Sequence, residues 1–460
     1  MKTEKASQPA ESLPADDSAE PNTFHGERAG RSSLRFFGPG FLVAAAFIGP
    51  GTVNTAVRAG GEYGFHLLWT VLFAGVATVI FQEMAARLGL VTRKGLAESI
   101  QDFFPQPIVR KVCLWVIFAA IIFGNTAYQA GNLTGAARGL GHFVPAFPLQ
   151  LWLLVSAGLA FYLVWSGSLK TIKLVLSGMV LIMSLTFLVT AIASRPSFPD
   201  LLSGCFSFDI PLENLGIMFA IIGTTVVPYN LFLHSSIVAE QNGKLPLVVT
   251  EEVEDSREPD PTPAQAEPDG GAPEWQQAID GVRLDTWVAV FVGALVTASI
   301  VVTAAGADAV SLEEAGERFS ELLGSFGSGL FFLGLFAAGL TSAITAPLAA
   351  GYVHAGLFGY ETRANSRQVR KVAAMVLLIG YVVAALFGSS PDQVIFLAQV
   401  ANALVLPLIA VFLLLVMNSR KVLGPYRNNW RQNLFGGLVV AFVVALALYK
   451  LGSELGVIGR

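Results

Sequence analysis

Long runs of apolar residues dominate the chain from about residue 41 onward, and short polar segments separate them. Each run has about twenty residues, which is the length an α-helix needs to cross the hydrocarbon core of a bilayer. The pattern predicts an all-α polytopic membrane protein with about eleven transmembrane helices. The predicted helices cover residues 41–64, 67–88, 112–134, 149–166, 171–194, 214–240, 285–305, 326–356, 371–388, 392–417 and 432–450.

Two of these runs are interrupted near their middle. Gly49-Pro50-Gly51 interrupts the first run and Pro228 interrupts the sixth, so each is expected to form two half-helices with an unwound centre. Breaks in two helices that are five helices apart along the chain are typical of transporters built from two inverted repeats. Such transporters bind their substrate at the breaks. The predicted parts are residues 36–210 for the first repeat (helices 1 to 5), 211–420 for the second (helices 6 to 10), and 421–460 for the eleventh helix and the C-terminus.

The polar segments predict the orientation. Residues 1–35 combine Ser, Pro, Ala and charge without the apolar stretch of a signal peptide, which indicates a disordered cytosolic tail. Residues 243–280 contain an acidic run and several prolines, which indicates a disordered acidic cytosolic loop. Lys and Arg gather in alternate loops, as they do on the cytoplasmic side of membrane proteins. We therefore expect a cytoplasmic N-terminus and an extracellular C-terminus, in the plasma membrane of a bacterial cell.

Composition narrows the function. The chain is 53% hydrophobic and 13% charged, against roughly 25% charged in soluble domains, and its net charge of -4 does not suit nucleic-acid binding as a main function. Cys113 and Cys205 lie far apart with no CxxC spacing, so neither a disulfide framework nor a structural zinc site is expected. The sequence shows neither a paired nucleophile and base nor a nucleotide-binding loop, so it does not indicate an enzyme. No resident cofactor is expected.

Motifs around the breaks point to one family. They are Gly38-Pro39-Gly40-Phe41-Leu42-Val43-Ala44, Gly49-Pro50-Gly51, Ala85-Ala86-Arg87-Leu88-Gly89, Gly223-Thr224-Thr225-Val226-Val227-Pro228-Tyr229-Asn230, Ala337-Ala338-Gly339-Leu340-Thr341-Ser342 and Ala398-Gln399-Val400. On these motifs the chain resembles the Nramp family of metal-ion transporters from Gly38 to the tenth predicted helix. The resemblance implies a LeuT-type fold of five plus five helices, with a divalent metal ion as substrate at the breaks of helices 1 and 6.

The chain departs from the family pattern at the metal site. Family members normally read Asp-Pro-Gly-Asn at the first break, where Asp and Asn bind a transition-metal ion, but this chain has Gly49 and Thr52 at those positions. The sixth break normally supplies a Met thioether and an Ala carbonyl, where this chain has Val227 and Thr224. A thioether favours softer ions, whereas oxygen ligands suit hard cations such as Mg²⁺. These departures resemble the Nramp-related magnesium transporter branch.

The proton-carrying groups of the family are also missing. Family members are typically coupled to protons through acidic residues on the third helix, yet this chain has no Asp or Glu between Asp102 and Asp200. His234 is retained, and we interpret it as a helix-packing residue more readily than as a proton carrier. We therefore expect transport that is not coupled to protons and is driven by the electrochemical gradient.

The predicted ion site is a wide cavity that holds a largely hydrated ion. Mg²⁺ loses its waters reluctantly, and neutral oxygens can bind those waters instead of the metal. The predicted substrate is Mg²⁺, with Mn²⁺ as a second ion. The metal-site residues are Gly49, Thr52, Thr224, Thr225, Val227, Tyr229, Asn230, Gln399 and Asn402.

Several alternatives stay open on the sequence. Thr52 and Thr225 would also suit a role in capping half-helix ends, and Asn230 would suit satisfying freed backbone groups. The whole chain would also fit a non-transporting sensor or scaffold with a decayed metal site, a proton-coupled transition-metal transporter, or a carrier of an organic solute. The bilayer and the ion are the expected partners, and the oligomeric state is left open.

Overall fold

The computed structural model describes residues 38–211, 215–242, 272–305, 311–387 and 391–454, without the side chains of 272–275, 387, 391–404, 447 and 450–454. Residues 1–37 lie outside the described residues, so the predicted N-terminal tail is not tested, and the described residues belong to one compact unit. Its described residues form helices and no strand, which confirms the all-α fold class.

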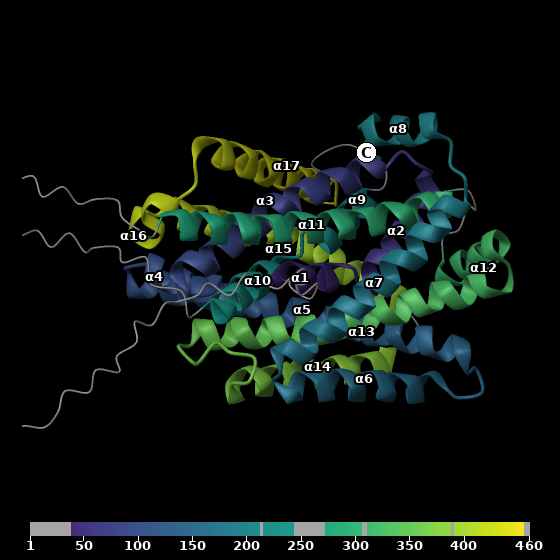
Figure 1. Ribbon diagram of the computed structural model, residues 1–460, viewed down its shortest axis with the longest axis horizontal. Coiled ribbons are helices and arrows are strands. Elements are labelled where there is room, and N and C mark those ends of the chain that lie inside the picture. The colour runs from purple at the N-terminus through teal and green to yellow at the C-terminus, as the bar shows by residue number, and fades with distance from the viewer. Residues whose placement is uncertain (1–37, 212–214, 243–271, 306–310, 388–390, 455–460) are drawn as a thin grey trace, which may run out of the picture. The chain divides into compact units, whose positions relative to one another are not determined.

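A helix covers each of the eleven predicted segments (Figure 1). Their bounds are α1 Pro39–Phe47 with α2 Pro50–Tyr63, α3 Leu68–Thr92, α5 Pro107–Phe143, α6 Leu149–Ser166, α7 Leu169–Ala193, α9 Leu215–Thr225 with α10 Pro228–Gln241, α11 Ala272–Ala305, α13 Gly327–Leu357, α14 Arg367–Phe387, α15 Pro391–Asn418 and α17 Trp430–Glu454. Four shorter helices lie between them: α4 Leu96–Phe103, α8 Phe198–Phe206, α12 Leu312–Leu323 and α16 Arg420–Leu423. By length and composition, 8 helices of the described chain could cross a membrane, or up to 10 if each bent pair counts as one span.

Both predicted breaks are present. The axes of α1 and α2 differ by 56°, and Ile48 and Gly49 separate the two helices. Pro228 begins α10, where its missing N–H costs no helical hydrogen bond, and the extended backbone of Val227 separates α10 from α9. The prediction of two half-helices in the first and sixth runs is therefore confirmed.

The broken helices lie inside the bundle. The apolar 18-residue stretch of Leu215–Gln241 is completely buried. In the corresponding stretch of Pro107–Phe143, only 11% is buried. α5 and α13 pack along each other, α11 packs against α2 and α3, and α15 packs against α9. Because the chain is apolar on nearly every face, the small residues of these helices decide how closely they approach. Gly339 of α13, for example, has no room for a Cβ because the backbone of Ala136 lies there.

α11 begins earlier than the sequence pattern predicts. Residues 272–280, placed in the acidic loop on the basis of charge, form the first turns of α11. The physical reason is tertiary: Ile279 is buried in a small cluster with Leu90 and Val238, and Arg283 pairs with Glu83 of α3. The remainder of the predicted loop, 243–271, lies outside the described residues.

Candidate functional site

Thr52 joins the two broken helices. Its hydroxyl donates to the carbonyl oxygen of Phe47 at the end of α1 and lies 2.7 Å from the hydroxyl of Thr224 in α9. The amide N–H of Gly49 also points at the Thr52 oxygen, 3.4 Å away. Because a hydroxyl has one proton, Thr224 must be the donor to Thr52. Thr52 therefore caps the break that it was predicted to line, and its hydroxyl has no remaining capacity to bind an ion directly.

A second contact uses a carbonyl freed by the break. The hydroxyl of Tyr229 donates to the carbonyl oxygen of Ala46 at 3.2 Å, and the hydroxyl of Ser342 in α13 lies 3.4 Å from the same oxygen. The Tyr229 ring packs edge-on against Tyr128 of α5. The break in the first span is thus closed by side chains from the sixth and eighth spans, because a buried carbonyl without a partner is costly.

Neutral oxygens surround the position at which the family resemblance leads one to expect a carboxylate. A Cβ built on Gly49 would lie 2.7 Å from the hydroxyl oxygen of Ser342 and 3.6 Å from the side-chain oxygen of Asn132. The backbone of Gly49 is extended, with φ -102°, so any residue could adopt it. The space is therefore restricted by Ser342 and not by backbone conformation.

Asn230 is buried without a visible partner. It lies in the first turn of α10 with no solvent exposure, and neither amide atom has a hydrogen-bond partner among the described residues. A buried amide that lacks partners costs roughly 1 to 3 kcal/mol. Such a group is expected to meet water or a ligand, whereas the alternative role in satisfying freed backbone groups has no bond to support it here.

Two other predicted residues contribute less polar surface. The Thr225 hydroxyl donates to the carbonyl oxygen of Ile221 in its own helix at 2.8 Å, and the Thr225 carbonyl accepts from Thr78 of α3. Val227 is buried and carries no polar side-chain atom. Neither side chain therefore offers a free polar atom to an ion, and their place at an ion site remains a prediction.

Gln399 and Asn402 fall in the first half of α15, whose backbone is helical. Their side chains lie outside the described residues. α15 packs against α9, α2 and α10, so this helix lies beside both breaks. Their role at the site remains a prediction.

Two polar residues of the third span, Asn125 and Gln129, serve helix packing. Asn125 donates to the carbonyl oxygen of Ala346 at 2.9 Å, and Gln129 donates to that of Ala343 at 3.1 Å, both across the contact between α5 and α13. On α10, His234 is buried with its Nδ1 3.0 Å from the side-chain oxygen of Gln82 in α3. An amide oxygen only accepts, so Nδ1 carries the proton and the bond ties α10 to α3.

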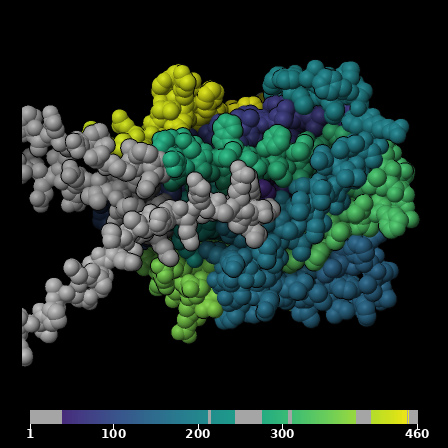
Figure 2. Space-filling model, viewed as in Figure 1, coloured from purple at the N-terminus to yellow at the C-terminus, as the bar shows by residue number. Residues whose placement is uncertain are grey.

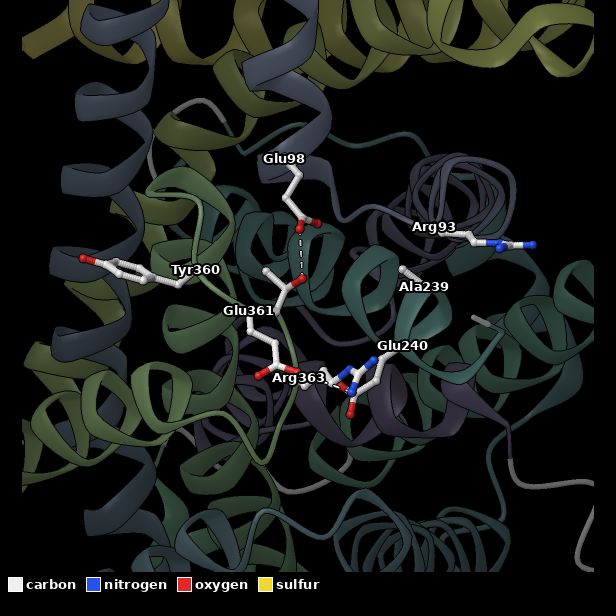
Figure 3. Close-up of a pocket in the computed structure, with 8 residues that line it drawn as sticks. Arg93, Glu98, Ala239, Glu240, Tyr360, Glu361 and Arg363 are labelled. Carbon is white, nitrogen blue, oxygen red and sulfur yellow. Dashed lines mark hydrogen bonds and ion pairs between the residues drawn. The ribbon is translucent and has the colours of Figure 1, made fainter. Parts of the chain in front are cut away.

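A polar pocket lies beyond the end of α10 (Figure 3). Its volume is about 300 Å³, and its walls include Glu98 of α4, Glu240 of α10 and the segment after α13. Glu98 accepts from the hydroxyl of Thr362 at 2.9 Å, and Glu240 accepts from the backbone N–H of Ala364 at 3.1 Å. Burial raises the pKa of the Glu98 carboxyl, although the hydrogen bonds from Gly95 and Thr362 oppose the shift. Both carboxylates hold helix ends together, and no group of three or more His, Cys, Asp or Glu in the described chain could hold a metal ion.

Removing the Thr52 hydroxyl is expected to destabilise the fold. Thr52→Val keeps the side-chain shape but leaves the Phe47 carbonyl and the Thr224 hydroxyl without a partner, which should cost about 2 kcal/mol. Thr52→Ser, which keeps the hydroxyl, is the matched control and should lie near the parent. Thermal denaturation in detergent measures both, and equal midpoints for Val and Ser would contradict the capping role.

Sequence reasoning missed Ser342 as a site residue. Ser342 belongs to a matching motif, but it was not assigned to the site because its position in the eighth span does not indicate that it faces the first break. Asn132, a polar residue of the third span, is also absent from the predicted site. A polar residue on an otherwise apolar membrane helix was the available signal for both.

Comparison with known proteins identifies relatives over nearly the whole chain. The family model described as "Natural resistance-associated macrophage protein-like" (Nramp) matches residues 40–453. A protein of Aeromonas hydrophila subsp. hydrophila named divalent metal cation transporter MntH is 28% identical over 437 residues, which cover 92% of this chain and 97% of that protein.

Two solved structures share the fold. A manganese transporter from Eremococcus coleocola superposes with a TM-score of 0.73 at 20% identity, covering 92% of this chain and 87% of that chain. MhsT in complex with L-phenylalanine superposes with a TM-score of 0.57 at 17% identity, covering 91% of this chain and 98% of that chain. At these identities the structures support the architecture of paired broken helices and not a particular substrate.

Proposed function

The chain belongs to the Nramp family of membrane transporters, and from the chemistry of its two breaks we propose that it carries divalent metal ions with Mg²⁺ as the main substrate and Mn²⁺ as a second one. The observation that carries the proposal is the surroundings of Gly49. Among the described residues, the polar atoms nearest to a Cβ at that position are the neutral oxygens of Ser342 and Asn132. The described residues at the two breaks, 47–52 and 224–230, include no carboxylate and no thioether.

Such a site suits an ion that keeps its water. Stripping a divalent ion of water without a carboxylate to replace it is unfavourable, whereas hydroxyl and amide groups can bind the waters of an intact shell. Thr224 and the unpartnered amide of Asn230 are the described groups that support this, with Gln399 and Asn402 as predicted contributors. Weak discrimination among divalent ions follows, because a hydrated ion presents mainly its waters to the protein.

The hydrogen bonds of the third span support transport without proton coupling. Asn125 and Gln129 are engaged with α13, and His234 with Gln82. A divalent ion carries two charges, so a potential of 100 mV, negative inside, favours its entry by about 4.6 kcal/mol, twice the value of roughly 2.3 for one charge. That potential would suffice to concentrate Mg²⁺ without a second ion.

A transition metal is the alternative substrate. It is favoured by the relatives, because the Aeromonas protein is named a divalent metal cation transporter and the Eremococcus protein a manganese transporter. The absence of a soft ligand at Val227 weighs against strong selectivity for such an ion. The two proposals predict different affinities for the transported ion, so one uptake experiment distinguishes them.

Uptake of Mg²⁺ without proton movement is the expected result in proteoliposomes. Vesicles containing the purified chain and a Mg²⁺-sensitive dye are energised with valinomycin and a K⁺ gradient. Mg²⁺ should enter with an apparent affinity in the high micromolar to millimolar range, roughly 4 to 6 kcal/mol. A pH-sensitive dye in parallel vesicles should show no acidification that follows the Mg²⁺ concentration, because no titrating group is proposed at the site.

Three outcomes would overturn this proposal. Competition by Mn²⁺ or Cd²⁺ at sub-micromolar concentration would indicate a soft or carboxylate ligand that the proposal excludes. Acidification in step with uptake would indicate proton coupling and would point to His234. Absence of any ion uptake, with the protein folded and reconstituted, would favour the sensor or scaffold alternative.

A further inference from the structure

An apolar groove with a basic edge lies between α3, α11 and α17. Its volume is about 520 Å³, and we call it the α3/α11/α17 groove. In Figure 2, α11 is the blue-green helix that crosses the upper part of the view, and yellow atoms of the C-terminal part of the chain lie above it. The groove is lined by Val79, Ile80, Glu83, Met84, Arg283, Leu284, Trp287, Asn429, Arg431, Gln432 and Phe435.

The groove lies where the polar and apolar parts of two helices meet. Arg283 comes just before the apolar run 285–305, and Arg431 comes just before the run 432–450. Trp287 and Trp430 lie at the same boundary and are 59% and 69% exposed. Tryptophan and arginine at the ends of membrane helices are typical of the level of the lipid headgroups. Both boundaries lie at the membrane end that the Lys and Arg distribution predicts to be cytoplasmic.

The charges of the groove leave one positive charge in excess. Glu83 receives hydrogen bonds from Arg87 at 3.0 Å and from Arg283 at 2.9 Å, and Arg283 also lies 3.4 Å from Asp280. Arg431 is exposed and stacks over the ring of Trp430 at 5.5 Å. In the described part of the chain, no carboxylate lies within ion-pair distance of Arg431. Arg431 therefore lines the groove as an exposed arginine with no ion pair to a described carboxylate.

From these observations we propose that the α3/α11/α17 groove is a binding site for one anionic phospholipid. The guanidinium groups of Arg431 and Arg283 bind the phosphate. They also bind a second negative or hydroxyl group of the same headgroup. One acyl chain lies along Val79, Trp287 and Phe435. Arginine forms paired hydrogen bonds with phosphate oxygens, which gives the site its preference for a phosphate headgroup.

Charge distinguishes an anionic from a zwitterionic lipid here. A zwitterionic headgroup would bring an ammonium group next to Arg431 and Arg283, and the carboxylates near them in the described chain, Glu83 and Asp280, are already paired with arginines. An anionic headgroup meets the excess positive charge without such repulsion, and basic groups at the cytoplasmic surface attract anionic lipids. The exposed apolar wall excludes a purely soluble anion as the preferred ligand.

A lipid titration of the purified full chain tests the proposal. Native mass spectrometry in detergent, with phosphatidylglycerol and phosphatidylcholine of the same acyl chains, counts and ranks bound lipids. We expect one phosphatidylglycerol to bind at least about tenfold more tightly than phosphatidylcholine, and Arg431→Gln to remove that preference. Arg431→Lys, which keeps the charge but not the paired donors, should retain part of it.

Arg367→Gln is the matched control. Arg367 is an exposed arginine at the start of another membrane helix, α14, and lies outside the groove. Equal loss of phosphatidylglycerol binding in Arg367→Gln and Arg431→Gln would show non-specific attraction and would overturn the site. Location is tested with phosphatidylglycerol brominated on its acyl chains, which should quench less fluorescence in Trp287→Phe than in the parent. Unchanged fractional quenching would place the lipid elsewhere and overturn the proposal.

Discussion

The double variant Gly49→Asp/Ser342→Ala is expected to bind Mn²⁺ about 100-fold more tightly than the parent chain, a gain of about 2.8 kcal/mol at 1.4 kcal/mol per tenfold. The aspartate would supply a carboxylate, which the described residues of both breaks lack. Ser342→Ala is needed because the hydroxyl of Ser342 lies 2.7 Å from where the new Cβ would be. The extended backbone at position 49 accepts an aspartate, and that residue type is favoured before the first turn of a helix such as α2.

The matched control is Gly49→Ala/Ser342→Ala, which adds the same Cβ without a carboxylate. Isothermal titration calorimetry with Mn²⁺ and Mg²⁺ on the two double variants isolates the effect of the charge. Mn²⁺ should gain more than Mg²⁺, because Mg²⁺ gives up water less readily for an inner ligand. If the aspartate variant binds Mn²⁺ no better than the alanine control, the ion does not bind beside Gly49.

Asn230→Leu is expected to abolish most Mg²⁺ uptake while it stabilises the ion-free fold. The amide of Asn230 is buried with no partner in the described chain, so replacing it by an apolar side chain of similar size removes a desolvation cost of about 1 to 3 kcal/mol. If the amide binds the waters of the ion, the same change should lower uptake at least about tenfold. Opposite signs for stability and transport are what a ligand-binding group predicts.

Asn125→Leu is the matched control for this prediction. Its amide is equally buried but donates to the Ala346 carbonyl at 2.9 Å, so the variant should lose stability. Thermal denaturation without Mg²⁺ and dye uptake in proteoliposomes measure the two effects. A stability loss in Asn230→Leu similar to that in Asn125→Leu, with uptake preserved, would assign Asn230 a structural role.

The prediction of the fold succeeded where its signals are local. An apolar run of about twenty residues requires a helix in a bilayer, because only regular hydrogen bonding satisfies the backbone there. A proline in the middle of such a run removes a hydrogen bond, so the breaks at Pro50 and Pro228 were visible in the sequence. The start of α11 was misplaced because burial of Ile279 and the Arg283 to Glu83 pair come from residues far away in the chain.

The chain's own residues determined that it is a membrane protein, where two of its helices break, and which residue types stand at the two breaks. Tertiary structure alone decided which polar groups are engaged. The Thr52 hydroxyl is hydrogen-bonded to Phe47 and Thr224, and Ser342 fills the space beside Gly49. Asn230 has no partner in the described chain. The sequence shows which hydrogen-bonding groups exist. Their partners come from helices that meet only when the bundle packs. Whether such a group is available to bind an ion is therefore a property of the folded state.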